Sequence, residues 1–343
     1  MAHTAVAPQR GTFFPRIRPE DLLAVDHPVR LWPPHDQIRL NPVVRGIVFA
    51  VLFLALTIAI APVVGMVVGG LFSSHPRFYD IATAFAQLPV ILAAVGAYAA
   101  LAVIWEQRRL VELTPRRMAQ GLGVGLILGA ATISAAVAVL AVSHGYHVTG
   151  INHDYWMWGD LMTLGFTAAI VEEITFRGVL FRLLEEWVGT WGAIIGSAIS
   201  FGLIHTGNPL GTWTGAIGIA MEAGLLLGAL YALTRSLWTV MGLHFAWNMM
   251  LGPVFGLVVS GTSSRGHGWL DSTVTGPTWM TGGVFGIEAS WITITLATLL
   301  GIATMVVLAR SHQVVQPSWI RHRTLRQRTT DQPTDDEPHI CEE

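Results

Sequence analysis

The sequence predicts an all-α protein that crosses a membrane several times, with about eight helices around an intramembrane polar cavity. Of its 343 residues, 52% are hydrophobic and only 12% are charged, whereas a soluble domain usually carries about a quarter charged residues. The mean hydropathy is +0.54. The apolar residues also gather into stretches long enough to cross a bilayer. Together these observations exclude an ordinary soluble domain.

Hydropathy indicates eight apolar stretches, allowing for tilted helices and for helices enclosed by others. They are Gly46–Phe72, Ile81–Trp105, Gln120–Val142, Leu161–Phe181, Trp191–His205, Gly215–Leu233, Leu237–Phe255 and Ser290–Ala309. The fifth stretch is short, about 22 Å at 1.5 Å per residue. We therefore expect protein, and not lipid, to surround it.

Polar segments flank these stretches at both ends. The first segment is polar and rich in proline, and it lacks the apolar core and the cleavage site of a signal peptide. From Gln313 onward the chain cannot bury enough apolar area to fold, so we predict a disordered tail. The chain thus divides into a cytoplasmic segment (1–42), accessory helices (43–160), a core (161–255), an outer loop with the last helix (256–309) and the tail (310–343).

The arginines predict the orientation. All 20 basic residues are arginine, which we attribute to the codon composition of a GC-rich bacterium. Eighteen of them fall on one side of the eight stretches, against Arg77 and Arg265 on the other. The positive-inside rule then places both termini in the cytoplasm of a multi-pass protein of the cell membrane. An even number of helices agrees with this arrangement.

The remaining composition narrows the possible partners. The single cysteine, Cys341, excludes an intramolecular disulfide and a cysteine-rich metal site, and its position does not fit a prenylation signal. A net charge of -2 without a basic patch gives no sign of a nucleic-acid partner.

Small residues recur at helical spacing in two of the stretches. The third contains Gly121, Gly125 and Gly129, and the sixth contains Gly224 and Gly228. Such spacing lets helix backbones approach closely in a membrane. We therefore predict tight helix packing at these positions.

Ionisable residues inside the apolar stretches are costly, by at least about 3 kcal/mol each, so each requires a partner or a function. In "AAIVEEITFRGVLF", Glu173 and Arg177 are four residues apart on one helix face, which favours an ion pair. Glu172 is rotated by about 100° from Glu173 and does not share that partner. An unpaired carboxylate would suit a general base working near neutral pH. The alternative is that both glutamates only brace the helix bundle.

Two further motifs carry polar residues. His205 closes the fifth stretch in "FGLIH", where a histidine can also be merely interfacial. His244 and Asn248 are four apart in "HFAWN" and share one helix face. They could donate hydrogen bonds to an oxygen that gains negative charge in a transition state, or they could act only as polar contacts between helices.

Depth along the helices places these residues in one layer. Glu172 lies roughly 16 Å from the outer end of its stretch. His244, Asn248 and His205 lie roughly 10, 16 and 21 Å from the cytoplasmic ends of theirs. One carboxylate, two imidazoles and a carboxamide at similar depth predict a hydrolytic site.

In this order on successive helices, the motifs resemble the CAAX-protease and bacteriocin-processing family, also called CPBP or Abi. The matching elements are EExxxR from Glu172 to Arg177, FxxxH from Phe201 to His205, and HxxxN from His244 to Asn248. The resemblance covers about Leu161 to Leu251, roughly a quarter of the chain.

The resemblance implies an intramembrane endopeptidase that acts on a peptide or membrane-protein substrate in the bilayer. It implies that Glu172 activates a water molecule, which His205 helps to position. It also implies that His244 and Asn248 stabilise the oxyanion, while Glu173 and Arg177 support the site. Family members were once described as metalloproteases, but the spacing is not HExxH. We expect no cofactor; a bound zinc ion would have Glu172, His205 and His244 as ligands.

Two other functions fit parts of the pattern. A non-catalytic scaffold or bacteriocin-immunity protein could use the same cavity for binding. A proton-coupled transporter also uses buried acids and histidines, but no pair of broken helices in corresponding halves is evident. Glu222 belongs to none of the motifs; it could line the cavity or reach toward the outer face.

Overall fold

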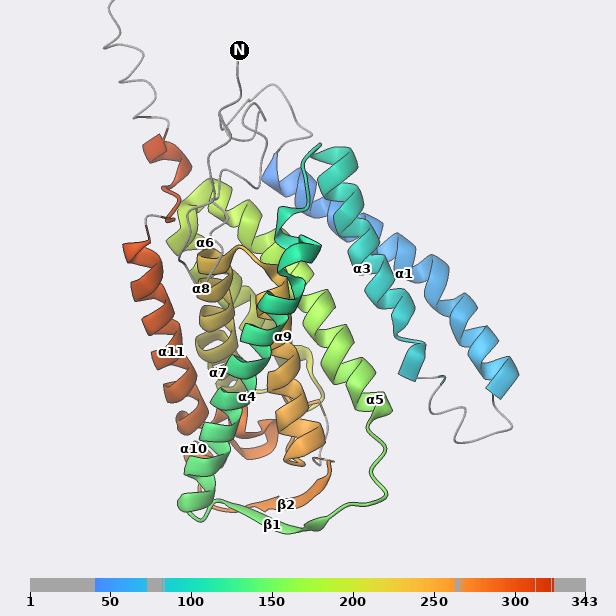
Figure 1. Cartoon of the computed structure of the whole chain (residues 1–343), viewed down its shortest axis with the longest axis vertical. Coiled ribbons are helices and arrows are strands. Elements are labelled where there is room, and N and C mark those ends of the chain that lie inside the picture. Colours follow the sequence, from blue (N-terminus) through green and yellow to red (C-terminus); the bar gives the residue numbers. More distant parts are fainter. Residues whose placement is uncertain are drawn as a thin grey trace, which may run out of the picture.

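The computed structural model describes residues 41–72, 82, 84–262, 266, 268–311, 313–321 and 323. Within them the chain is a bundle of helices with a two-stranded sheet at one end (Figure 1). The α-helices are α1 (Pro42–Phe72), α3 (Leu88–Ala99), α4 (Met118–Val142), α5 (Trp158–Asp160), α6 (Arg182–Ile204), α7 (Trp213–Ile219), α8 (Leu225–Thr234), α9 (Leu237–Met249), α10 (Thr278–Thr281) and α11 (Trp291–Arg310).

Wider π-helical turns extend or join several of these helices. They are η4 (Ala100–Trp105), η7 (Leu161–Glu172), η8 (Ile174–Phe181), η10 (Ala220–Gly224) and η11 (Met250–Val254). Short 3₁₀ turns cover Val111–Leu113, Pro115–Arg117, His205–Gly207, Gly283–Phe285 and Ile287–Ala289. The prediction of an all-α polytopic membrane protein is confirmed.

Six helical segments of the described chain are long and apolar enough to cross a membrane, so the predicted count of eight is not confirmed. One of the six, Trp158–Gly207, has 50 residues and includes two of the predicted stretches. Gly189, with φ of 76°, kinks the chain between them. The seventh predicted stretch corresponds to α9 and η11, which are almost wholly buried and are not among the six.

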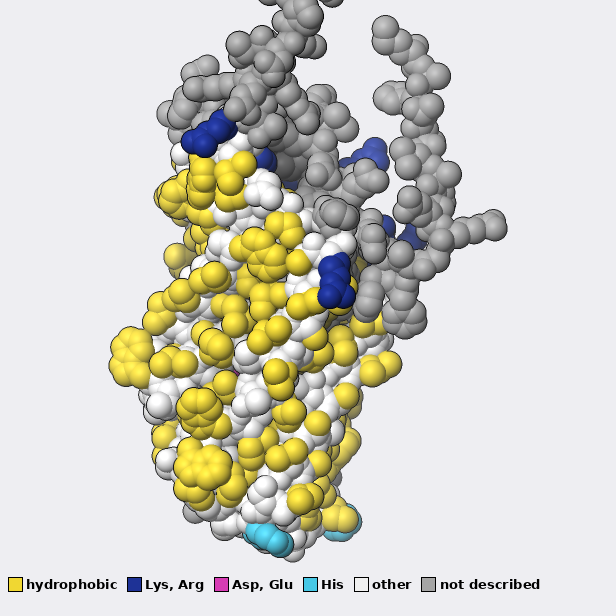
Figure 2. All heavy atoms as spheres, turned by 90° about the vertical axis from the view of Figure 1, so that its left-hand side faces the viewer, with side chains coloured by type: hydrophobic (Ala, Val, Ile, Leu, Met, Phe, Trp, Pro, Cys, Tyr) yellow, Lys and Arg dark blue, Asp and Glu magenta, His cyan; other side chains and the backbone are white. Residues whose placement is uncertain are grey.

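The outside of the bundle suits a lipid environment. Helices α1 and α3 run side by side at its edge (Figure 1), and only 6% of the apolar window of α1 is buried. Figure 2 shows hydrophobic side chains along the whole length of one face. On the same face, arginines lie toward one end and histidines lie at the other.

Helices α4 and α9 form the most closely packed pair in the bundle, because α4 presents glycines to α9. A Cβ atom added at Gly125 would lie 2.1 Å from the carbonyl oxygen of Thr239, and one at Gly129 would lie 2.4 Å from that of Leu243. At Gly224 an added Cβ would lie 2.8 Å from the Cα atom of Ala198. The predicted tight packing is therefore present at these positions, and it fixes the helix that carries the third motif.

Gly121 packs less tightly and Gly228 has ordinary contacts. An added Cβ at Gly121 would lie 2.9 Å from the Cβ of Trp238, whereas one at Gly228 would find its nearest atom at 3.7 Å. The close approach is thus strongest in the middle of α4, beside the first half of α9.

A buried cluster of ion pairs joins α1 to the chain between α3 and α4 and to the start of α6. Glu106 Oε1 lies 3.0 Å from Arg45 Nη1 and 2.8 Å from Arg182 Nη2, and its Oε2 lies 2.7 Å from Arg108 Nε. Glu186 pairs with Arg45 and Arg182 as well. Burial alone would raise the pKa of the Glu106 carboxyl, but the charges of Arg182, Arg108 and Arg45 outweigh it and lower the pKa to about 2. Arginines that indicate orientation in the sequence therefore also hold the helices together.

Two predictions about segments outside the helices need correction. The segment predicted to be an outer loop contains strand β2 (Leu270–Val274), which pairs antiparallel with β1 (Tyr146–Ile151). The predicted disorder of the tail is wrong for residues 313–321. Val315 accepts a hydrogen bond from the Thr190 amide at 3.0 Å and donates one to Thr190 Oγ1 at 2.8 Å. The kink at Gly189 leaves hydrogen-bonding groups of Thr190 available, and the tail binds there. The prediction of disorder considered only the small apolar area of the tail and not such hydrogen bonds.

Residues 1–40 and most of the remaining tail lie outside the described residues, so the predicted N-terminal segment and the rest of the tail stay predictions.

Candidate active site

The first motif lies where two π-helical segments, η7 and η8, follow each other. Such wide turns recur at functional sites. Glu173 and Arg177 are both fully buried, and Arg177 Nη1 lies 2.9 Å from Glu173 Oε1. The ion pair expected from their spacing is therefore formed.

Arg177 is held on several sides. Its Nη2 donates to the carbonyl oxygens of Ala223 at 3.2 Å and Gly224 at 3.4 Å. Its guanidinium carbon lies 4.5 Å from the centre of the Phe201 ring, close enough for a cation–π interaction. The buried charge is thus balanced by a carboxylate, two carbonyls and an aromatic face.

His244 lies between the two glutamates. Its Nδ1 is 2.8 Å from Glu173 Oε1, and its Nε2 is 3.9 Å from Glu172 Oε2. An ionised carboxylate only accepts hydrogen bonds, so Nδ1 carries the proton and Nε2 faces Glu172. Donation from Nε2 then requires a second ring proton.

Glu172 differs from its neighbour in both pairing and exposure. Its side chain is 28% exposed, whereas that of Glu173 is fully buried. Within the described part of the chain, Glu172 Oε2 has no hydrogen-bond partner. One glutamate is therefore tied to Arg177 and His244, and the other keeps a carboxylate oxygen for further chemistry.

The second motif brings His205 to the end of α6. Its Nδ1 lies 2.7 Å from the carbonyl oxygen of Phe201. Because a carbonyl can only accept, Nδ1 donates and Nε2 of the neutral ring is left as an acceptor. The Phe201 ring also lies 4.9 Å from the His205 ring and 6.0 Å from the His244 ring, centre to centre. Phe201 therefore sets the spacing of Arg177 and both histidines.

Asn248 ties α9 to the helix of the first motif. Its Nδ2 donates to the carbonyl oxygen of Leu164 in η7 at 2.8 Å. The amide keeps a second N–H and its carbonyl oxygen for another partner.

His205, His244 and Asn248 line one small cavity of about 10 Å³, roughly the space that a single water molecule needs. Its other polar lining comes from Trp247, Ser260 and Glu288, and the rest is apolar. Glu172 is not part of this lining, and it reaches the group through His244. The structure thus brings the three motifs together. His244 of the third motif contacts both glutamates of the first motif and lines the cavity together with His205 of the second.

Glu288 is a cavity residue that the sequence analysis missed. It is 1% exposed and precedes the last apolar helix by three residues, so an acid next to an apolar stretch was the available signal. Glu222, which was noticed, is fully buried, and within the described residues neither of its carboxylate oxygens has a hydrogen-bond partner. It is not among the residues that line the cavity.

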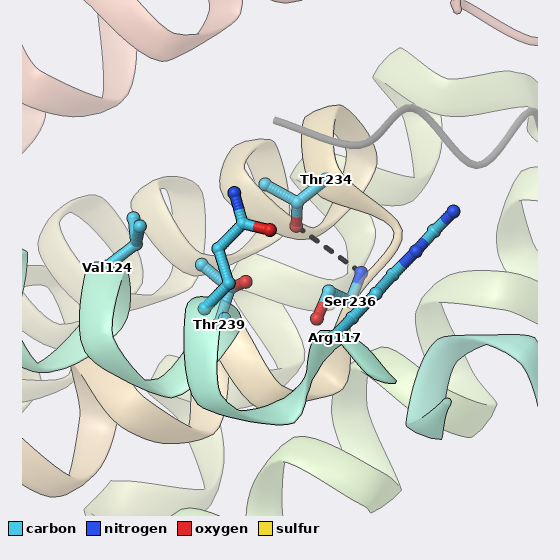
Figure 3. Close-up of a pocket in the computed structure, with 7 residues that line it drawn as sticks. Arg117, Val124, Thr234, Ser236 and Thr239 are labelled. Carbon is cyan, nitrogen blue, oxygen red and sulfur yellow. Dashed lines mark hydrogen bonds between the residues drawn. The ribbon is translucent and has the colours of Figure 1, made fainter. Parts of the chain in front are cut away.

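A second pocket lies where α4 and α9 begin (Figure 3). Arg117, Val124, Thr234, Ser236 and Thr239 line it, and Thr234 Oγ1 accepts a hydrogen bond from the Ser236 amide at 3.4 Å. None of the residues of the three motifs lines it. The residues that the sequence singled out for chemistry therefore line the first cavity or, like Glu172, lie next to a residue that lines it.

The candidate metal ligands do not form a metal site in this arrangement. Across the described residues, no three His, Cys, Asp or Glu side chains are placed to hold one ion. Glu172 and His244 are close, but His205 does not complete a set with them.

Comparison with known protein families agrees with this site. Residues 154–250 match the family described as type II CAAX prenyl endopeptidase Rce1-like. The matched range contains all three motifs and ends before Glu288. No curated protein and no solved structure matches the chain. The resemblance seen in the motifs is thereby confirmed for one part of this polytopic membrane protein: residues 154–250 match a family of CAAX-type endopeptidases.

Proposed function

We propose that the protein is an intramembrane endopeptidase in which Glu172 activates the water molecule that attacks a peptide bond. The observation that carries the proposal is the unequal pairing of the two glutamates. Glu173 is neutralised by Arg177 and holds His244, while Glu172 lies 3.9 Å from the other nitrogen of the same ring. The proposed base and the proposed hydrogen-bond donor thus lie 3.9 Å apart, and the donor is buried.

The steps follow from these positions. Glu172 takes a proton from water, and the hydroxide oxygen forms a bond to the substrate carbonyl carbon. The carbonyl oxygen becomes an oxyanion, which accepts hydrogen bonds from His244 Nε2 and from the second N–H of Asn248. When the tetrahedral intermediate collapses, the C–N bond breaks and the leaving nitrogen takes the proton from Glu172. The free Nε2 of His205 accepts a hydrogen bond from the attacking water and orients it.

Glu173 and Arg177 position the site without contacting the substrate. His244 donates through Nε2 only as an imidazolium, and the glutamates on either side balance that charge. Arg177 in turn holds Glu173 by an ion pair, and Glu173 accepts the hydrogen bond from Nδ1 and fixes the ring plane.

The substrate class is a peptide or a membrane protein that enters from the bilayer. Support comes from the burial of the site among helices and from the apolar part of the cavity lining, which includes Phe201, Leu227 and Leu243. The family model is named for enzymes that cleave prenylated CAAX proteins. A signal-like peptide, a bacteriocin precursor and another membrane protein are the substrate candidates for this chain.

The test compares purified wild type with Glu172→Gln and His244→Ala, each incubated in detergent with extracted membrane proteins. New peptide N-termini are mapped by mass spectrometry. We expect new termini with the wild type and none with Glu172→Gln, whereas Glu222→Gln should behave as the wild type. Equal cleavage by folded Glu172→Gln would refute the mechanism.

The two rival functions give other outcomes. A scaffold or immunity protein would keep its cellular phenotype in both Glu172→Gln and His244→Ala. A proton-coupled transporter would move a solute into proteoliposomes without cleaving any protein.

We also propose that both termini face the cytoplasm of the cell membrane. The clustering of arginines toward one end of the bundle supports this orientation (Figure 2). The single cysteine, Cys341, gives a direct test with a membrane-impermeant maleimide. Labelling should require lysis of the cells; labelling of intact cells would reverse the orientation.

A further inference from the structure

Glu288 is a buried acid outside the segment that matches the family. It belongs to the short turn Ile287–Ala289 that precedes α11, and it lines the same cavity as His205 and Asn248. A buried carboxylate is costly unless hydrogen bonds satisfy it. Its partners therefore indicate what it does.

Three donors converge on this carboxylate. Trp247 Nε1 donates to Oε1 at 2.9 Å, the Ser260 amide donates to Oε2, and Ser260 Oγ lies 3.2 Å from each oxygen. Charge-assisted bonds of this kind are stronger than neutral ones. Both carboxylate oxygens are thus occupied by two residues from different parts of the chain.

Through Trp247, Glu288 is linked to the third motif. Trp247 immediately precedes Asn248 on α9, so fixing its indole restrains the backbone that carries the Asn248 side chain. Asn248 in turn bonds the Leu164 carbonyl in η7. Glu288 therefore restrains α9 next to Asn248, whose side-chain amide is the proposed hydrogen-bond donor to the oxyanion.

Through Ser260, Glu288 is linked to the second motif. The Ser260 carbonyl oxygen accepts a hydrogen bond from Asn208 Nδ2 at 2.6 Å, and the Asn208 amide donates to the His205 carbonyl at 3.3 Å. Ser260 has φ of 47°, a left-handed conformation that costs energy for a residue other than glycine. The bonds from Glu288 hold this conformation in place.

We propose that Glu288 is a positioning residue that joins the second and third motifs by holding Trp247 and Ser260 on one carboxylate. Its effect on catalysis rests on the proposed peptidase function, whereas its effect on structure does not. Glu222 is the control, because it is an equally buried glutamate that interacts with Glu288 through charge alone, with no hydrogen bond to any described residue and no place in the cavity lining.

The structural test uses the four asparagines of the chain. Selective ¹⁵N labelling of asparagine gives an NMR spectrum in which the side-chain amides of Asn208 and Asn248 report the two links separately. Glu288→Gln replaces one acceptor oxygen by an NH₂ group that faces hydrogen-bond donors. The chemical shifts of the Asn208 and Asn248 side-chain amides should therefore both change. Glu222→Gln should move neither of them.

Asn41 and Asn152 serve as internal references, since neither bonds to this network. Asn208 and Asn248 resonances that stay unchanged in Glu288→Gln would overturn the proposal. If Glu288→Gln does not fold, Trp247→Phe removes one donor only; the Asn248 resonance must then move more than that of Asn208, and an unmoved Asn248 resonance overturns the proposal.

The kinetic test uses a peptide that the wild type cleaves. We expect Glu288→Gln to lower kcat roughly 10- to 100-fold, as small misplacements of catalytic groups do, with KM changed less than about twofold. Trp247→Phe should cause a smaller loss, and the double variant should lose less than the product of both. An unchanged kcat in Glu288→Gln would overturn the proposal. A wild type that cleaves nothing refutes the peptidase function, while the NMR result still decides the role of Glu288.

Discussion

The packing of α4 on α9 can be tested with two glycines of the same helix. In Gly125→Ala, the new Cβ atom would lie 2.1 Å from the Thr239 carbonyl oxygen and 2.6 Å from the Leu243 amide nitrogen. Both are backbone atoms, so no side chain can rotate to make room. At Gly123 an added Cβ would meet nothing within 4 Å, which makes Gly123→Ala the matched control.

Two effects set the size of the difference. Overpacking a well-packed interior costs about 1–3 kcal/mol, and contact with rigid backbone places Gly125→Ala near the upper end. Replacing glycine by alanine in a helix gains up to about 1 kcal/mol in both variants. We therefore expect Gly125→Ala to lower the free energy of unfolding by about 2 kcal/mol, and Gly123→Ala to raise it by up to about 1 kcal/mol.

The assay is reversible unfolding of the purified protein in mixed micelles titrated with sodium dodecyl sulfate, followed by tryptophan fluorescence. Peptide hydrolysis gives a second measurement, because α9 carries His244 and Asn248 and should shift when α4 is pushed away. Equal stability of Gly125→Ala and Gly123→Ala would refute the close packing of the two helices.

Three other predictions concern charge. The pKa of Glu106 is lowered from 4.5 to about 2, so its stabilisation is fully present above about pH 4.5 and is lost as the pH falls toward 2. Unfolding titrations of the wild type should show a loss of up to about 3 kcal/mol over that range, which Glu106→Gln should lack; equal acid sensitivity of both would contradict the ion-pair cluster. Arg177→Met leaves Glu173 buried without its cation and should lower the free energy of unfolding by about 3–5 kcal/mol, whereas a change below about 1 kcal/mol would argue against that pair. A chelator should leave peptide hydrolysis unchanged, and a loss restored by zinc would show a metal enzyme.

Much of the fold could be predicted because membrane helices are recognised in a sequence as long apolar stretches. The predicted count of eight crossing helices is not confirmed, because α9 is enclosed by its neighbours and two predicted stretches lie on either side of the Gly189 kink within one run of 50 residues. The pairing of Glu173 with Arg177 followed from helical spacing alone.

Contacts between distant segments were beyond sequence reasoning. The cluster around Glu106 depends on arginines that lie 61 and 76 residues away along the chain. Glu288 reaches Trp247 across 41 residues, and no spacing rule connects them. The docked tail at Thr190 and the pairing of β1 with β2 are of the same kind.

In the proposed mechanism Glu172, and not the neighbouring Glu173, activates the water molecule. The most direct measurement compares newly formed protein N-termini in membranes of cells that carry the wild type or Glu172→Gln, with equal amounts of folded protein in both. We expect a set of termini that the wild type produces and the variant lacks. Identical sets in the two membranes would contradict the claim.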